Sequence, residues 1–178
     1  MDRFSILVGD ITQSDAEAIV NAADPSLLGG AGVDGAIHAA AGPELLAECR
    51  TLGGCERGQA KLTAGYRLRA KYVIHTPGPV WQGGDHGEAA LLASCYRSCL
   101  ETAAARGIRT LDFCSISTGV YGYPLPLAAT VALRTIMEFL AGRALPERVR
   151  MVCHSEAAAE ASRQTWNLWN GEEKDRRL

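Results

Sequence analysis

The sequence predicts an α/β domain in which helices cover both faces of a central β-sheet. Short β-rich segments, such as residues 4–8 and 18–21, alternate along the chain with longer segments of helical periodicity. Polar or glycine-rich residues follow these strands and a later one, at Gly9-Asp10, in residues 21–35 and in residues 117–122. Because ligands in such sheets bind beyond the carboxyl ends of the strands, the three segments predict a single site.

Length and charge narrow the class of protein. The chain has 178 residues and a formal net charge of −2. We expect one domain over residues 1–170, followed by a charged tail over residues 171–178. The charge balance offers no basic surface, so nucleic acid is not an expected partner. The first residues lack the apolar stretch of a signal peptide and no segment has membrane-spanning length, which predicts a cytoplasmic protein without membrane contacts.

Each further element has its own local signal. Residues 12–15 resemble a capping box for a short helix, and Pro43 suits the first turn of another. Gly107 and Gly142 end two longer helices. Further strands are expected at residues 60–63, 72–75, 111–116 and 149–153, and helices at residues 33–41, 43–49, 88–106, 124–140 and 155–169, the last capped by Ser155.

The six cysteines are predicted to be reduced and mostly buried, because no CxxC pair is present. A zinc site or a disulfide framework is the alternative. The cysteines are Cys49, Cys55, Cys95, Cys99, Cys114 and Cys153.

A glycine loop (residues 29–35) carries the main signal for ligand binding. Its glycines allow backbone N–H groups to approach a ligand, and the helix that follows adds free N–H donors. Asp34 lies in the first turn of that helix, and we interpret it as facing a sugar or a water. The string Gly30-x-Gly32-x-x-Gly35 matches a dinucleotide fingerprint, but eight residues separate Asn21 from Gly30, which argues against a Rossmann dehydrogenase.

A second loop (residues 117–122) offers another set of backbone donors, either as an anion-binding wall or as an ordinary strand-to-helix turn. Tyr121, between Gly119 and Gly122, is expected to face the ligand. Asp10 either caps the turn after its strand or accepts a hydrogen bond from an amino group such as that of adenine.

Histidines add little to the expected chemistry. His38 shares a helical face with Asp34, or else is a buried structural histidine. His75 and His86 are interpreted as structural or surface residues. No histidine or cysteine spacing completes a metal site.

At these residues the sequence resembles the macro domains, and specifically bacterial O-acetyl-ADP-ribose deacetylases of the MacroD-type class. The matching motifs are Gly9-Asp-Ile-Thr12, Asn21-Ala-Ala-Asp24, Gly29-Gly-Ala-Gly-Val-Asp-Gly-Ala-Ile-His38, Val73-Ile-His-Thr-Pro-Gly-Pro79 and Ile116-Ser-Thr-Gly-Val-Tyr-Gly-Tyr-Pro124. Motifs of this length in this order are highly specific, and the similarity extends over about residues 4–155.

The resemblance implies a three-layer α/β/α fold around a mixed sheet of about six strands, with ADP-ribose in a cleft above it. It implies that Asp34, Asp24 and Tyr121 are catalytic, with Asp34 positioning or activating the attacking water and Tyr121 closing over the distal ribose. Asp10 would bind the adenine amino group, with Ile11 beside it. The ligand-binding residues it implies are Asp10, Ile11, Asn21, Gly32, Val33, His38, Ser117, Thr118, Gly119, Val120, Tyr121 and His154.

The chain departs from the family pattern at two positions. His154 stands where the family has an aromatic residue that stacks on adenine. Asp24 stands where it has the second asparagine of N-A-A-N, and an ionised aspartate accepts hydrogen bonds but donates none. A second carboxylate near Asp34 and a diphosphate predicts a raised pKa for one of the two carboxyl groups. Either the pair shares a proton and keeps a working base, or ligand affinity and turnover fall.

The function implied is removal of acyl esters from the distal ribose, without cofactor or metal. The expected partners are ADP-ribose, its acyl esters and mono-ADP-ribosylated proteins, and we expect a monomer. One alternative is an ADP-ribose-binding module in which Asp24 has weakened or abolished catalysis. Another is a hydrolase for a different phosphorylated ribose, such as ADP-ribose 1″-phosphate.

Overall fold

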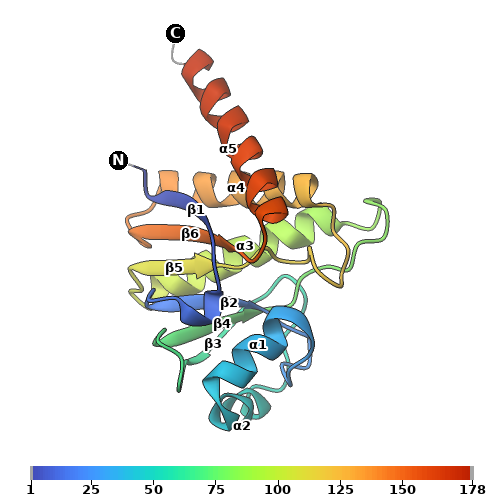
Figure 1. Cartoon of the computed structure of the whole chain (residues 1–178), viewed down its shortest axis with the longest axis vertical. Helices are drawn as coiled ribbons and strands as arrows, with labels where there is room; N and C mark the ends of the chain where they lie inside the picture. The colour runs from blue at the N-terminus through green and yellow to red at the C-terminus, as the bar shows by residue number, and fades with distance from the viewer. Residues whose placement is uncertain (1, 177–178) are drawn as a thin grey trace.

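A six-stranded mixed sheet forms the centre of the molecule (Figure 1). The computed structural model describes residues 2–176, with side chains described through residue 172. The strands lie in the order β1-β6-β5-β2-β4-β3, and every neighbouring pair is parallel except β3 with β4. The strands are β1 (Phe4–Val8), β2 (Ala18–Ala22), β3 (Lys61–Ala64), β4 (Tyr72–Thr76), β5 (Thr110–Phe113) and β6 (Arg148–Cys153).

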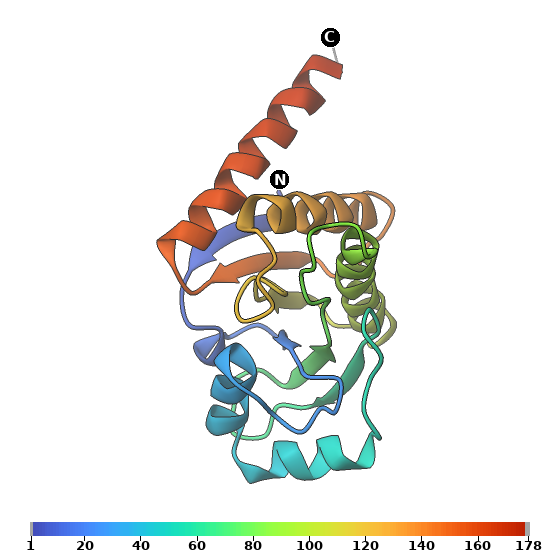
Figure 2. The same cartoon turned by 90° about the vertical axis from the view of Figure 1, so that its right-hand side faces the viewer.

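Helices flank the sheet, as the alternating pattern predicted (Figures 1 and 2). Helices α1 and α2 lie against β2 and β3, α3 packs on β4 and against α4, and α5 contacts α4, β1 and β6. The helices are α1 (Gly32–Ala41), α2 (Pro43–Thr51), α3 (Glu88–Ala105), α4 (Leu125–Ala141) and α5 (Glu156–Arg176), with a short 3-10 helix η1 (Ile11–Gln13) after β1.

The inner strands are covered on both faces. Residues 18–21 of β2 and 73–76 of β4 are all buried, so neither strand shows the alternation of a half-exposed strand. This is the burial expected of parallel strands between two helical layers. It gives the three-layer architecture that the sequence predicted.

Three element ends differ from their predicted positions. The turn after β1 is capped by Asp10, whose Oδ1 accepts the Thr12 N–H at 2.9 Å, and not by a box at residues 12–15. Strand β5 ends at Phe113, because the chain leaves the sheet before Ile116 to enter the second loop. Helix α5 is capped by Ser155 as predicted but continues to Arg176, beyond Trp169.

The predicted charged tail is therefore helical over residues 171–176. Gly171 does not end the helix, and the Glu, Lys and Arg residues that follow have high helix propensity. The end of α5 projects away from the body of the molecule (Figures 1 and 2).

All six cysteines are buried and free, which confirms the reduced state predicted for them. Among the helices described, none combines the length and the apolar character that crossing a bilayer requires.

Candidate functional site

The topology brings the predicted site segments to one edge of the sheet. Strands β1, β6, β5, β2 and β4 are parallel, so the loops that leave their carboxyl ends share that edge. Strand β2 lies between β5 and β4. The segment that leaves β2 towards the glycine loop therefore begins between the second loop and the end of β4. Asp10 and His154 follow the neighbouring strands β1 and β6. The edge is where α/β sheets bind ligands.

The glycine loop is closely packed at its centre. A Cβ on Gly35 would lie 2.5 Å from the Gly30 carbonyl oxygen, and one on Gly30 would lie 3.1 Å from Asp34 Oδ2. Helix α1 then begins without a side-chain cap, and the N–H groups of Gly29, Gly30 and Ala31 donate no hydrogen bond within the described residues. The loop therefore holds unused backbone donors beside a carboxylate.

Asp34 belongs to a buried polar network. Its Oδ1 accepts a hydrogen bond from Asn21 Nδ2 at 2.9 Å, and the same amide nitrogen lies 3.1 Å from His75 Nδ1. On the other side of the ring, His75 Nε2 lies 2.9 Å from Thr63 Oγ1. Asn21 and His75 are register partners on β2 and β4, so the sheet itself sets their spacing.

The network fixes the proton on His75. An amide nitrogen only donates, so His75 Nδ1 must accept from Asn21, and the ring hydrogen must lie on Nε2, donated to Thr63. Burial, with a smaller contribution from the nearby His38, lowers the pKa of His75 from 6.5 to about 3, so the ring is neutral. His75 thus uses one amide hydrogen of Asn21 and leaves the other for Asp34.

Several atoms of this region lack a partner. Of the five buried side-chain N or O atoms without a hydrogen bond in the described residues, four belong to predicted site residues. They are Asn21 Oδ1, Asp34 Oδ2, His38 Nε2 and Ser117 Oγ. His38 Nε2 lies 3.4 Å from Asp34 Oδ1, outside hydrogen-bond geometry. Because buried polar atoms are normally satisfied, these four indicate that a ligand or water completes the site.

The second loop has a strained backbone at its start. Ser117 has a φ of 66°, a left-handed conformation that is uncommon for a residue with a side chain. A Cβ on Gly78 would lie 2.2 Å from Ser117 Oγ, so only glycine fits at that approach. The N–H groups of Gly119, Val120 and Tyr121 donate no hydrogen bond within the described residues. These donors are available to an anion.

A neighbouring loop after β4 braces the second loop. The Trp81 N–H donates to the Tyr121 carbonyl at 2.8 Å, and the Trp81 and Tyr123 rings lie 4.6 Å apart. Glu88 holds this loop by accepting the N–H groups of Gln82, Gly84 and His86. Burial would raise the pKa of Glu88, but these hydrogen bonds outweigh it and lower the pKa to about 2. The sequence did not indicate this brace.

Asp24 lies exposed at the start of the loop that follows β2, where its Oδ2 accepts the N–H and the hydroxyl of Ser26 at 2.9 and 2.6 Å. Those hydrogen bonds, together with the charge of Arg57, lower the pKa of Asp24. The predicted rise in pKa is therefore wrong for Asp24. Its carboxylate is stabilised in the ionised form by a local turn.

Arg57 was not predicted as a site residue. Its guanidinium donates to the Gly78 carbonyl and lies 5.2 Å from the centre of the Tyr121 ring. Only proximity in the fold reveals it, because the loop between α2 and β3, residues 52–60, contains no motif.

Asp10, Ile11 and His154, which the resemblance assigns to adenine, follow the ends of β1 and β6. Asp10 is exposed and uses one carboxylate oxygen as the cap of η1, so the capping interpretation is confirmed and its other oxygen remains free within the described residues. Ile11 is buried against the core, and His154 is exposed directly after β6.

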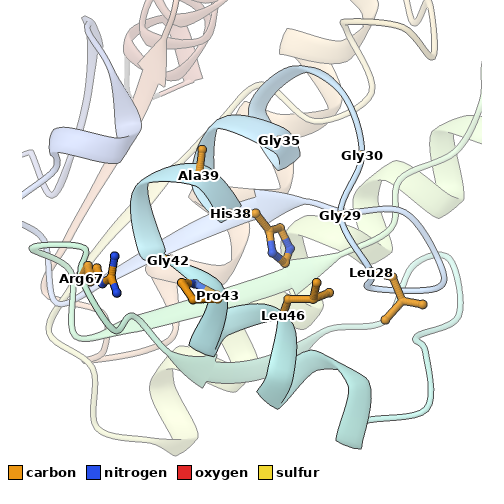
Figure 3. A pocket seen from close by; sticks show the side chains of 10 residues that line it. All are labelled: Leu28, Gly29, Gly30, Gly35, His38, Ala39, Gly42, Pro43, Leu46 and Arg67. Carbon is orange, nitrogen blue, oxygen red and sulfur yellow. The ribbon is translucent and has the colours of Figure 1, made fainter.

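A pocket of about 410 Å³ lies beside this site (Figure 3). Gly29, Gly30 and His38 line it together with residues of α2 and Arg67, but no residue of the second loop does. The pocket is therefore on the outer side of the glycine loop. The strand ends and the unpartnered atoms of Asn21, Asp34 and Ser117, none of which lines this pocket, indicate a ligand site on its inner side.

Comparison with known proteins agrees with this geometry. The Macro domain family model matches residues 20–132. An O-acetyl-ADP-ribose deacetylase from Salmonella gallinarum is 54% identical over 161 residues, which cover 88% of this chain and 90% of that protein. The structure of the Oceanobacillus iheyensis macrodomain with ADP has a TM-score of 0.90 at 41% identity, covering 94% of this chain and 91% of that one. The Trypanosoma brucei macrodomain in complex with ADP-ribose has a TM-score of 0.86 at 42% identity, covering 91% of this chain and 68% of that one.

Proposed function

The chain belongs to the macro domain family, and we propose that it is an ADP-ribose-binding hydrolase that removes acyl esters from the distal ribose. O-acetyl-ADP-ribose is the first substrate to test, and ADP-ribose esters of protein carboxylates are the second. The single observation that carries the proposal is the unpartnered Oδ2 of buried Asp34, next to the unpartnered Oδ1 of Asn21.

Asp34 is suited to position a water. Its Oδ1 is occupied by the Asn21 amide, so the carboxylate cannot rotate freely and Oδ2 is left as the acceptor. A water held there would bond through its oxygen to the acyl carbon. The bond from that carbon to the ribose oxygen then breaks, the ribose oxygen takes a proton, and acetate, ADP-ribose and one proton leave.

The loops supply the electrostatic part of the chemistry. The free N–H groups of residues 29–31 and 119–121 suit the diphosphate and the negative charge that develops on the acyl oxygen. In the proposed mechanism, Asp34 and Asn21 lie next to the reacting group, and the backbone of the second loop lies next to the phosphates.

Acetate release from O-acetyl-ADP-ribose tests the proposal. Asp34→Asn keeps the size of the side chain and removes the carboxylate, so we expect turnover to fall by about 10²-fold or more with ADP-ribose affinity largely retained. A variant as active as the wild type would contradict the role of Asp34.

Asp24 favours one second candidate, a binding module without turnover. Its carboxylate accepts from Ser26 and gives the ligand no donor. That candidate predicts ordinary ADP-ribose affinity by calorimetry and no acetate release by the wild type. The remaining alternative is a hydrolase for another phosphorylated ribose. Phosphate release from ADP-ribose 1″-phosphate tests that alternative.

A further inference from the structure

The site predicted for an anionic ligand is rich in carboxylates. Asp10, Asp24 and Asp34 all belong to it, and none of the predicted site residues is a lysine or an arginine. A diphosphate approaching three carboxylates meets an unfavourable field, which the backbone donors alone must overcome. A cation close to these residues would change that balance.

Arg57 is placed to be that cation. The Cys55 N–H donates to the Pro25 carbonyl at 2.8 Å, which attaches the Arg57 loop to the chain directly after Asp24. On its other side, the Gly58 N–H donates to the Pro77 carbonyl at 3.0 Å, at the end of β4. The guanidinium is thereby held between the Asp24 turn and the Tyr121 ring.

The guanidinium has most of its donors unused. Within the described residues it makes one hydrogen bond, to the Gly78 carbonyl, and has no carboxylate within ion-pair distance. An arginine has five N–H donors in a planar fork that suits phosphate and carboxylate oxygens. A half-buried cation beside an aromatic face, with free donors, is a binding group for an anion.

We propose that Arg57 is a further ligand-binding residue of this cleft, which balances the charge of Asp24 and offers its free N–H donors to the anionic ligand near Tyr121. The inference rests on the proposed function only in taking ADP-ribose as the ligand. It also explains how a carboxylate at position 24 is compatible with binding an anion. The positive charge of Arg57 also contributes to lowering the pKa of Asp24, in agreement with the proposal.

Calorimetry with ADP-ribose on four proteins tests the inference. We expect Arg57→Ala to weaken binding about fivefold and Asp24→Asn to strengthen it by up to about fivefold. The double variant should return to within about twofold of the wild type, because the two charges are removed together. Arg57→Lys should keep most of the affinity, and the effect of Arg57→Ala should shrink as salt is raised.

The lysine variant and the salt dependence separate this role from a structural one. If Arg57 only supports the Tyr121 ring, the loss in Arg57→Ala will not shrink as salt is raised and Arg57→Lys will bind as weakly as Arg57→Ala, and that result would overturn the inference. Wild-type affinity in Arg57→Ala would overturn it too. Arg134→Ala, which removes an exposed charge on α4, is the matched control for net charge and should bind like the wild type.

The same experiment separates the inference from the proposed function. Equal weakness of Arg57→Ala and Arg57→Lys at every salt concentration, with acetate release by the wild type intact, would contradict the role of Arg57 alone. Absence of acetate release, with the expected pattern of four affinities, would contradict hydrolysis and leave Arg57 as a binding residue.

Discussion

Two aspartates ten residues apart in the sequence have opposite environments. Asp34 is buried, accepts a hydrogen bond from a buried amide and keeps one oxygen without a partner. Asp24 is exposed, accepts from the serine two residues later, and lies in the field of Arg57. The first is oriented by the sheet, through β2 and β4, whereas the second is oriented by its own turn.

This difference suits the two aspartates to two different roles, positioning a water and adjusting the charge near the ligand. From the sequence alone, both aspartates were predicted to act in catalysis. A carboxylate that positions a water needs a fixed orientation and a free oxygen, which burial beside Asn21 supplies. A carboxylate at the rim adjusts the charge that an incoming anion meets. Asp34 suits the chemical step and Asp24 suits ligand binding, so the two need not share a proton.

Among changes to these two environments, replacing His75 in the buried network around Asn21 and Asp34 should have the largest effect. His75→Leu removes the acceptor for one Asn21 hydrogen, and a buried unsatisfied donor costs about 1–3 kcal/mol in the free energy of unfolding. The freed amide would also misplace Asp34, lowering turnover by about 10- to 100-fold. Urea unfolding and acetate release measure the two effects.

His75→Asn is the matched control, because its side-chain oxygen takes the place of Nδ1 and can still accept from Asn21. It should retain more stability and more turnover than His75→Leu. Equal loss in both variants would show that ring packing matters and the hydrogen bond to Asn21 does not.

A smaller effect should appear as the pH is lowered. The folded protein keeps His75 neutral down to a pKa of about 3, whereas the unfolded chain takes up that proton near its ordinary value of 6.5. Protons therefore favour the unfolded state between these values, and the free energy of unfolding should fall as the pH drops from 6.5 towards 4. In urea titrations, His75→Asn should flatten this slope. An unchanged slope in that variant would show that His75 is not its source.

The smallest effect should come from replacing the exposed Asp24. The pKa of Asp24 is lowered from its ordinary value, so this carboxylate is ionised throughout the assay range. Asp24→Asn should then lower KM by a factor of up to about five at every pH above 5, without moving the acid limb of turnover. Profiles of kcat and kcat/KM from pH 5 to 8 measure this. An acid limb that moves in the variant would restore the shared-proton hypothesis.

The sequence by itself determined the fold class and the order of elements, and it indicated most residues of the candidate site. Alternating short strands and amphipathic helices require a layered α/β domain, and glycines at fixed spacings mark where backbone must approach a ligand or other backbone, as at Gly30 and Gly35. Asp34 could be proposed because an acid in the first turn of that helix competes with a phosphate for the backbone donors of the glycine loop, and because the motif around it resembles the family pattern. These signals involve residues that are close together in the sequence, so they can be recognised without the structure.

Only the tertiary structure decided which groups support the site. His75 and Arg57 lie 54 and 33 residues after the residues whose chemistry they affect, Asn21 and Asp24, and no local pattern links either pair. Parallel strand pairing places His75 beside Asn21, and loop hydrogen bonds place Arg57 beside the Asp24 turn. Hydrogen bonds and charges act over a few ångströms in space, whatever the separation in sequence. For that reason the identity of Asp34 was evident from the sequence, while its orientation and the state of Asp24 were not.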